Sequence, residues 1–568
     1  MMNKLFVHDM VHNNPGLETY ETAYNDPGFL KERGYDGKVF HLFDSAAFGL
    51  TWERLNQAYP EREKVFPESS PEIKWVENKS ADLKQKYVSA AKAGLGVYFM
   101  MDIIVLPKRI IKLYPEILNE EGKIDICTER MQEIIGYMFD EMFEKFPEIA
   151  GIYIRYGETY VGNRYNTPYH CGNNPIQGNE IDYHKRLISM LIDEVCIKHK
   201  RQIFYRTWGF GAFQFDPEFY LEVSNMIPPN PLFYFCIKHT AGDFHRTFPF
   251  NQCLNIGIHQ QVVEVQAARE YEGKGAYPNY IAGGVIHGFT ELEWVMQPGQ
   301  TKCLMDVAAL DDSLIKGLWT WSRGGGWNGP YIMGKNGVNG EIIVEGGSEL
   351  WCDVNAYVLT CWAKDMSHPA DFYVKQYAQK ELGMKEADAE IFLKIQNLSS
   401  QAVLLSRGTN LPCLDWNVFW TRDQNINYDY LMDNIESAYQ KGILEEMLAE
   451  KKESVRIWQK IVNLAQSLDE KTETRNYIIT TCRYGLYLYS IYEAMYRGNA
   501  RAYYGGSREE VKEAVRDYDA LWESWNNLYE TEKGCPTLYE KKPQILDLIG
   551  YVGNTGFDYA MDRLRMEA

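Results

Sequence analysis

The first 365 residues alternate short apolar runs with amphipathic segments. Eight apolar runs have the length of buried strands, and several are bounded by Gly or Pro; they occupy residues 4–10, 38–44, 95–104, 149–158, 201–208, 231–239, 260–266 and 315–321. Segments between them place apolar residues three and four positions apart, which predicts helices over 80–94, 129–146, 183–199 and 217–227. Regular alternation of strand and helix predicts a parallel sheet.

Eight strand–helix units over this length favour an α/β fold of the (β/α)8 TIM-barrel type for residues 1–365, with an open doubly wound sheet as the alternative. From about Pro369 the pattern changes to long helical periodicity at 372–383, 444–468, 476–499 and 508–529. We therefore expect a mostly α-helical C-terminal domain over 366–568. This domain either packs on the barrel or mediates self-association, which makes it the candidate surface for a homodimer.

Charge and composition narrow the class of partner. The 568 residues carry a net charge of −19, which disfavours nucleic acid and anionic membrane surfaces as partners. No run approaches the ~20 apolar residues of a membrane span, and the start MMNKLFVHDM lacks the features of a signal peptide. We expect a cytoplasmic protein, or a periplasmic or secreted one if a signal peptide has been removed. The 11 cysteines, without CxxC spacing, predict buried free thiols in a reducing compartment.

Chemistry-bearing residues follow five of the predicted strands. Working residues of such barrels lie at the C-terminal ends of strands and on the loops after them. The candidates there, in chain order, are Arg155, Glu158, Arg206, Trp208, Lys238, His239, Asp243, Glu264, Glu270, Trp319 and Trp321. The two tryptophans of strand eight precede a Gly-rich loop suited to a cleft wall.

Three carboxylates among these candidates point to glycoside hydrolysis, which needs one carboxylic acid and one carboxylate. Glu158 would face Asp243 and Glu270 across the barrel mouth. The alternative is structural: Glu158 caps a turn and Asp243 pairs with Arg246. Aromatic residues make up 14% of the chain, which suits stacking on sugars and filling a large core equally well.

Arg155, Arg206 and Lys238 add positive charge at strand ends of an acidic protein. Such a set suits a substrate with a carboxylate, such as a uronic acid; the alternative is that these cations neutralise the protein's own carboxylates. His239, Asp243 and His245 match no firm metal signature. Phosphate-binding glycine loops and a GxSxG motif are also missing from the sequence, so we expect neither a metal nor a cofactor.

Three stretches resemble glycoside hydrolase family 67, the α-glucuronidases that act on xylan fragments. IKHTAGDFHR is similar to the family's Lys-Asn-Gly-x-x-Asp-Phe segment through Lys238 and Asp243. QQVVEVQAAREYEGKG matches two family glutamates through Glu264 and Glu270. Residues 349–383 resemble the helix that leads into the family's C-terminal domain, with Asn355 and Tyr357 in matching positions.

The resemblance implies an inverting mechanism and assigns roles. Asp243 and Glu270 would activate the water, and Glu158 would be the general acid, although the family's acid lies in a Lys-Ala-Asn-Ser-Glu context absent here. Lys238 and Arg206 would hold the sugar carboxylate, with Arg155 implicated by location alone. The departures are that His239 replaces the family's Asn and that the chain begins almost at the first strand, without the family's preceding β-sandwich domain.

Two other functions remain open. In a polysaccharide lyase, Lys238 or Arg206 would neutralise a uronate while His239 or a tyrosine abstracts the C5 proton. In a non-catalytic carbohydrate-binding barrel, turnover would be lost, although binding alone does not require three carboxylates. The leading hypothesis is an inverting hydrolase for an oligosaccharide substrate that carries a carboxylate.

Overall fold

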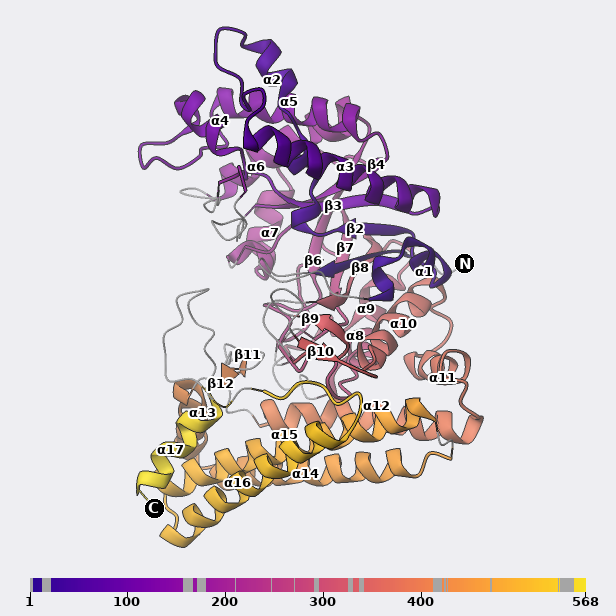
Figure 1. Cartoon of the computed structure of the whole chain (residues 1–568), viewed down its shortest axis with the longest axis vertical. Coiled ribbons are helices and arrows are strands. Elements are labelled where there is room, and N and C mark those ends of the chain that lie inside the picture. Colours follow the sequence, from indigo (N-terminus) through magenta and orange to yellow (C-terminus); the bar gives the residue numbers. More distant parts are fainter. Residues whose placement is uncertain are drawn as a thin grey trace.

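The computed structural model shows a closed eight-stranded parallel barrel joined to a helical region (Figure 1). It describes residues 4–12, 22–156, 167–170, 180–209, 211–246, 248–269, 271–290, 296–324, 330–336, 342–411, 421–422, 425–426, 428–469, 472–539, 541 and 556–567. The barrel strands are β1 (Phe6–His12), β2 (Gly37–Phe40), β3 (Gly96–Asp102), β4 (Ile149–Arg155), β5 (Gln202–Arg206), β6 (Phe233–Lys238), β7 (Gln260–Gln266) and β8 (Ile315–Gly324).

Closure of the barrel follows from pairing of the first and last strands. The strands are hydrogen-bonded in sequence order, and β8 pairs with β1 in parallel, with Phe6 opposite Gly317. All eight strands coincide with the apolar runs of the sequence because both faces of each strand are buried, one in the barrel and one under helices. The predicted TIM barrel with a helical C-terminal region is confirmed, and the open-sheet alternative is wrong.

Aromatic side chains fill the barrel interior. The His8 ring stacks on Phe6 and on Tyr98, with ring centroids 4.6 and 4.2 Å apart. The Tyr153 ring stacks on Phe204 at 4.4 Å, and the Tyr153 hydroxyl lies 2.9 Å from His8 Nδ1. This packed layer closes the lower part of the barrel, so that polar chemistry is confined to the strand ends above it.

Helices surround the barrel, and several of them begin at a capping residue. They are α1 (Pro27–Glu32), α2 (Glu53–Ala58), α3 (Pro71–Lys92), α4 (Lys108–Leu113), α5 (Glu129–Lys145), α6 (Glu180–Leu191), α7 (Pro217–Ser224), α8 (Ala282–His287), α9 (Leu304–Ala308) and α10 (Leu350–Lys364). Ser70, Thr128 and Asp216 accept backbone N–H groups at the starts of α3, α5 and α7. The predicted helix at 183–199 is α6 followed by a π-helical stretch, Ile192–Lys198.

The helical region comprises α11 (Ala370–Lys380), α12 (Glu386–Arg407), α13 (Tyr428–Gln440), α14 (Leu444–Gln466), α15 (Glu473–Tyr503), α16 (Arg508–Thr531) and α17 (Phe557–Glu567). Two small antiparallel pairs, β9 (Gly334–Asn336) with β10 (Ile342–Val344) and β11 (Thr421–Arg422) with β12 (Asn425–Ile426), complete the elements. At Gly485 of α15 an added Cβ would lie 2.5 Å from the Trp458 ring, so glycine permits the close approach of α14.

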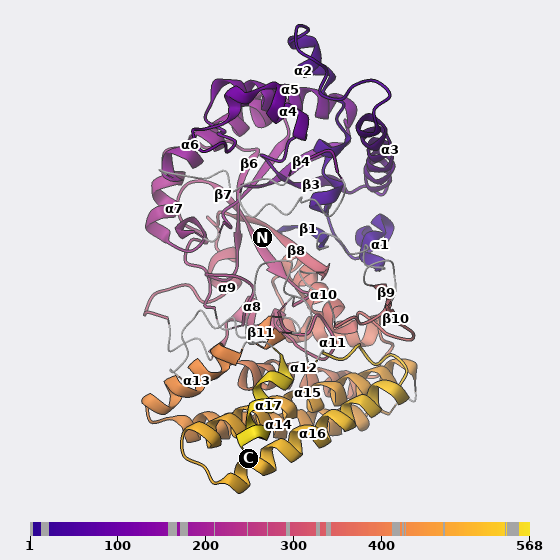
Figure 2. The ribbon, with the colours of Figure 1, turned by 60° about the vertical axis from the view of Figure 1, so that its left-hand side comes forward.

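The helical region lies across the end of the barrel where the strands finish, as Figure 2 shows. The predicted domain boundary at residue 365 stays a prediction; α10 ends beside it and packs on β8 and β1. Among the described residues, no helix is long and apolar enough to span a membrane. The described cysteines are free thiols, and most are buried.

Candidate active site

Three buried ion pairs line the C-terminal end of the barrel. Each joins one of the predicted cations to a carboxylate: Arg155 to Asp102, Arg206 to Glu264, and Lys238 to Asp243. The partners are far apart in sequence in the first two pairs, and barrel closure brings them together. The structure therefore places all three predicted cations at one mouth and shows that each is engaged by a protein carboxylate.

The Arg206–Glu264 pair is bidentate and fully enclosed. Arg206 Nε and Nη2 donate to the two carboxylate oxygens of Glu264, both at 2.7 Å, and the exposed fractions of the two side chains are 2% and 0%. The guanidinium also lies 5.6 and 5.5 Å from the ring centroids of Trp319 and Trp321. Trp319 is completely buried and packs on Tyr153 inside the barrel. Two parallel charge-assisted bonds of this kind fix the orientation of both side chains.

Asp243 lies on the loop after β6 and is held by three donors. Lys238 Nζ donates to Oδ1 at 2.5 Å, the Tyr271 hydroxyl donates to Oδ2 at 2.6 Å, and the backbone N–H of Phe244 donates to Oδ1 at 2.9 Å. Burial would raise the pKa of Asp243, but the charges of Lys238 and His245 and the bonds from Lys238 and Tyr271 hold this pKa well below its usual range. The carboxylate is therefore ionised at neutral pH, as a role beside the attacking water requires.

Lys238 is enclosed by aromatic rings as well as by Asp243. Its Nζ lies 3.5 Å from the centroid of the Trp208 ring and 4.4 Å from that of Phe244. Cation–π contacts of this kind stabilise an ammonium group that has lost water. Trp208 thus supports the Lys238–Asp243 pair from the end of β5.

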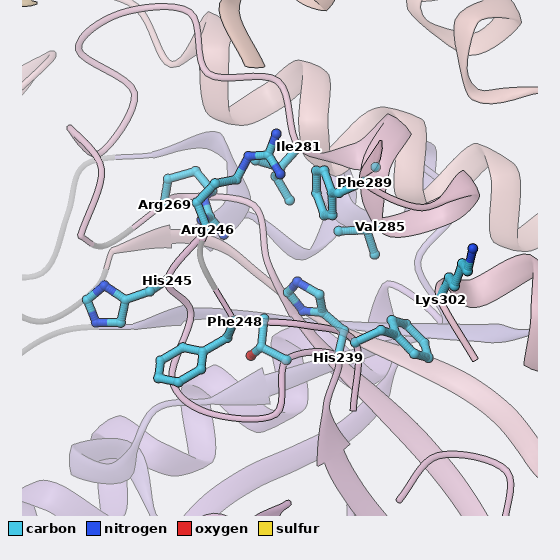
Figure 3. A pocket seen from close by; sticks show the side chains of 12 residues that line it. His239, His245, Arg246, Phe248, Arg269, Ile281, Val285, Phe289 and Lys302 are labelled. Carbon is cyan, nitrogen blue, oxygen red and sulfur yellow. The ribbon is translucent and has the colours of Figure 1, made fainter. Parts of the chain in front are cut away.

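His239 directly follows Lys238, on the loop after β6. Its backbone N–H donates to the Glu264 carbonyl at 3.0 Å, its Nδ1 lies 3.4 Å from the same oxygen, and its ring stacks on Phe244 at 5.8 Å. Burial, followed by repulsion from Arg269, lowers the pKa of His239 to about 3. His239 is therefore a neutral imidazole and lines a cavity behind the loop (Figure 3).

Glu158 and Glu270, the predicted acid and the second water-activating residue, lie outside the described residues. The alternative pairing of Asp243 with Arg246 is not what the structure shows: Asp243 binds Lys238, whereas Arg246 Nη2 donates to Ser400 Oγ at 2.9 Å. No group of three His, Cys, Asp or Glu side chains within the described ranges could hold a metal ion.

The sequence reading missed several residues at this mouth: Asp102, His12, Tyr271, Glu272 and Lys274. Asp102 was detectable, since it ends a buried strand as directly as Arg155 does. Lys274 lies between two glycines, and Gly273, Lys274 and Gly275 all have positive φ angles, of 85°, 48° and 85°. A lysine held in this left-handed conformation is typical of a functional loop.

Positive charge gathers around His12 at the centre of the mouth. Its ring stacks on Trp321 at 4.6 Å. Burial lowers the pKa of His12 well below the usual value, and the nearby His41, Arg155, Arg206 and Lys274 lower it further. The ring is therefore neutral, and the two nearby arginines are themselves paired with Asp102 and Glu264.

The helical region holds the loop after β7 in place. Arg407, the last residue of α12, donates from Nη1 to the carbonyl of Tyr271, whose hydroxyl binds Asp243. The N–H of Tyr280 in the same loop donates to Ser399 Oγ at 3.1 Å. From α10, beside the helical region, Asn355 Oδ1 accepts the N–H of Ile281 at 2.9 Å. The helical region thus fixes the tyrosine that orients the candidate catalytic carboxylate.

Because several histidines are buried in the neutral form, we expect the free energy of unfolding to decrease at acidic pH. Burial lowers the pKa to about 3 for His8, His41, His184 and His239. Their unfolded-state pKa is near 6.5, so the unfolded chain takes up protons first, and stability present above pH 6.5 is lost as the pH falls toward 3. Burial raises the pKa of Asp9 to about 6. The folded state therefore binds this proton first, and Asp9 increases the free energy of unfolding as the pH falls from about 6 to 4.

We therefore expect the free energy of unfolding to fall by about 3 kcal/mol between pH 6.5 and 5.5, because roughly 1 kcal/mol from each of these histidines outweighs the gain from Asp9. Urea denaturation at several pH values measures this. His184 Nδ1 lies 2.8 Å from the Tyr205 hydroxyl, and His184→Leu should reduce the pH slope by about one proton. A stability that is flat or rises toward pH 5.5 would contradict the prediction.

Comparison with known proteins supports the fold and identifies its neighbours as glycoside hydrolases. No family model and no curated protein matches this chain. Among solved structures, a GH138 enzyme targeting pectin rhamnogalacturonan II is similar with a TM-score of 0.55 and 12% identity, over 100% of this chain and 83% of that one. At this identity the likeness shows the fold alone.

Two further solved structures have a TM-score of 0.38 and 9% identity. They are an O-GlcNAc hydrolase mutant of Thermobaculum terrenum, matched over 100% of this chain and 94% of that one, and CpGH84B, over 98% and 76%. Both are too distant to support an inference about this chain. The resemblance to family 67 stays a prediction.

Proposed function

We propose that this protein is a glycoside hydrolase that acts on an oligosaccharide with a carboxylate-bearing sugar. The observation that carries the proposal is the ionised, buried carboxylate of Asp243, oriented by Lys238 and Tyr271 at the C-terminal mouth of a closed parallel barrel. Active sites of such barrels lie at this end. The similarity to a GH138 glycoside hydrolase supports the same class of reaction.

In this proposal Asp243 aligns the attacking water rather than removing its proton. A carboxylate with a strongly depressed pKa is a weak base, but it is a fixed negative charge that stabilises the oxocarbenium-like transition state. Proton removal then falls to Glu270, and Glu158 protonates the leaving oxygen. With separate groups for acid and base, water attacks the face opposite the leaving group and the anomeric configuration inverts.

The cations at the mouth support an acidic substrate, although Arg155 and Arg206 are also paired with Asp102 and Glu264. Arg155, Arg206 and Lys274 all depress the pKa of His12, so they act on the same central space. The specific form of the proposal is an α-glucuronidase-like enzyme that removes uronic acid side groups from hemicellulose fragments such as xylan. The family resemblance at Lys238 and Asp243 supports this form.

The test incubates the protein with glucuronic-acid-decorated xylan fragments, rhamnogalacturonan fragments and neutral xylan fragments, and follows products by proton NMR. Release of a uronic acid of inverted anomeric configuration supports the proposal. A product of retained configuration would contradict inversion, and an unsaturated product absorbing in the near ultraviolet would indicate a lyase. Binding of these fragments without any product would favour the carbohydrate-binding barrel.

A further inference from the structure

Two adjacent residues of the loop after β7 contact the loop that carries Asp243. The Tyr271 hydroxyl donates to Asp243 Oδ2 at 2.6 Å. The next residue, Glu272, accepts the backbone N–H of Arg246 at Oε1, at 2.9 Å. Arg246 follows Asp243 by three residues in the loop after β6. The side chain that orients the carboxylate and the side chain that binds the backbone of the same loop are therefore neighbours in the chain, so that a movement of Glu272 also moves Tyr271.

Glu272 is buried, and its carboxylate also binds two residues of its own loop. Arg269 Nε donates to Oε2 at 3.0 Å, and Arg269 Nη2 lies 2.7 Å from Oε1. Asn279 Nδ2 donates to Oε2 at 2.8 Å. One carboxylate thus joins three segments: the start of the loop after β7, the end of that loop, and the loop after β6. Charge-assisted bonds in this number fix the position of all the groups that they connect.

The negative charge of Glu272 is maintained by its neighbours. Burial by itself would raise its pKa, but the charge and the hydrogen bond of Arg269, followed by the charge of Arg407 and the hydrogen bond of Asn279, lower this pKa to about 2. Arg407 is the last residue of α12, and it also donates to the carbonyl of Tyr271. The helical region therefore acts on both residues that contact the loop after β6.

The loop after β7 has an unfavourable backbone conformation at its start. Arg269 and Lys274 have φ angles of 52° and 48°, in the left-handed region that residues other than glycine rarely adopt. Such residues persist only where the surrounding contacts over-determine them. At Arg269 these contacts are its two bonds to the Glu272 carboxylate and the N–H groups of Glu272 and Lys274, which donate to the Arg269 carbonyl at 3.0 and 3.2 Å. Removal of the carboxylate would therefore release a strained segment.

The bonds of Glu272 also limit what this residue can do. A carboxylate has about four acceptor positions. Arg246 and Arg269 occupy two of them at Oε1, and Arg269 and Asn279 occupy two at Oε2. A carboxylate in this state is neither a base nor a substrate ligand, so any effect of Glu272 on a reaction passes through the residues that it holds.

We propose that Glu272 is a positioning residue of the active site. It holds the loop after β7 against the loop after β6, so that the Tyr271 hydroxyl stays on Asp243 while the substrate is bound. The participation of Asp243 in catalysis rests on the proposed function, whereas the link between the two loops does not. Loops of a barrel leave separate strands, so a link between them sets the geometry of groups that two strands contribute.

Hydrogen–deuterium exchange followed by mass spectrometry tests the link without any turnover. Glu272→Gln removes the charge that binds Arg269 and weakens the bond to the N–H of Arg246. Peptides that contain Arg246, and peptides from 271–281, should exchange about tenfold or more faster in this variant, because local opening of both loops costs less free energy. Peptides of β4 serve as the internal reference and should stay within about twofold of the wild type.

The matched control is Glu141→Gln in α5. Glu141 is also a buried carboxylate that accepts backbone N–H groups of another segment, those of Thr51 and Trp52, at 2.7 and 3.0 Å. This variant should lower the melting temperature as Glu272→Gln does, but it should leave exchange in the loops after β6 and β7 unchanged. A general loss of stability is thereby separated from the specific release of these two loops.

Kinetics on a cleavable substrate test the positioning role. Glu272→Gln should lower kcat by about 30-fold and leave KM within about threefold, because it displaces Asp243 through Tyr271 and does not touch the sugar. Glu141→Gln should leave both constants within about twofold of the wild type. If Glu272→Gln does not fold, Glu272→Asp replaces it: this variant keeps the charge but is one methylene too short to reach Arg269 and the N–H of Arg246 together.

The outcomes separate this proposal from the proposed function. Unchanged exchange of both loops in the Glu272 variants would overturn the link. Faster exchange with unchanged kcat, or the same loss of kcat in Glu141→Gln, would overturn the positioning role. If the wild type cleaves none of the fragments, the proposed function fails, and the exchange experiment still decides whether Glu272 holds the two loops together.

Discussion

Asp243→Asn is expected to lower kcat by roughly 10³-fold on a cleavable uronic-acid-bearing oligosaccharide, with the fold intact. The substitution keeps the size of the side chain but removes the negative charge that Lys238 and Tyr271 hold in place. An amide cannot stabilise the positive charge that develops on the sugar in the transition state. Initial rates measured with the substrate identified by the NMR panel provide the readout.

A matched control separates this effect from a general loss of carboxylates. Asp216→Asn changes the N-cap residue of α7, whose side chain accepts the N–H groups of Glu218 and Phe219, and should leave kcat within about twofold, because asparagine is also a good capping residue. Tyr271→Phe removes one hydrogen bond to Asp243 and should have an intermediate effect. Full activity of Asp243→Asn would refute the role assigned to Asp243.

Arg206→Met is expected to destabilise the protein by about 3–5 kcal/mol, because it leaves Glu264 charged and unpaired in the barrel interior. The exposed fraction of the Glu264 side chain is 0%, so water cannot replace the lost partner. Guanidinium denaturation of the wild type and the variant measures the difference in the free energy of unfolding.

The double variant Arg206→Met/Glu264→Met gives the discriminating comparison. Replacing both members of a buried ion pair by apolar residues of similar size is often neutral, so the double variant should regain most of the stability that the single variant loses. A double variant as unstable as Arg206→Met alone would show that packing around the Trp319 and Trp321 rings, not the unpaired charge, causes the loss. A destabilisation below about 1 kcal/mol in the single variant would contradict the prediction outright.

Local sequence pattern was sufficient for the barrel. Each strand is a run of apolar residues buried on both faces, as in FYFCIK of β6, and such a run is recognisable without knowing its neighbours. The same holds for the long amphipathic helices α14 and α16. The pattern gave no expectation for α12, α13 or α17, and it did not anticipate the π-helical continuation of α6.

For the candidate site, the sequence could indicate which residues lie at the strand ends but not which residues they contact. Strand ends marked Arg155, Arg206, Lys238 and Asp243, since parallel strands of a barrel bring their carboxyl ends to one face. The partners of these residues could not be derived in this way. The expectation that Glu264 binds substrate stays a prediction, but its pairing with Arg206 was not foreseen, and Asp102 was not singled out although it binds Arg155.

The sequence by itself determined the barrel, the helical region and the placement of Lys238 and Asp243 at the end of β6. These features depend on periodicity and strand length, which are local properties. Only the tertiary structure decided that Tyr271 orients Asp243, that Arg407 from α12 holds Tyr271, and that Arg246 and Arg269 meet in one cavity. Such contacts join residues far apart in the chain, and they form only where barrel closure and the docking of the helical region fix the paths of the loops.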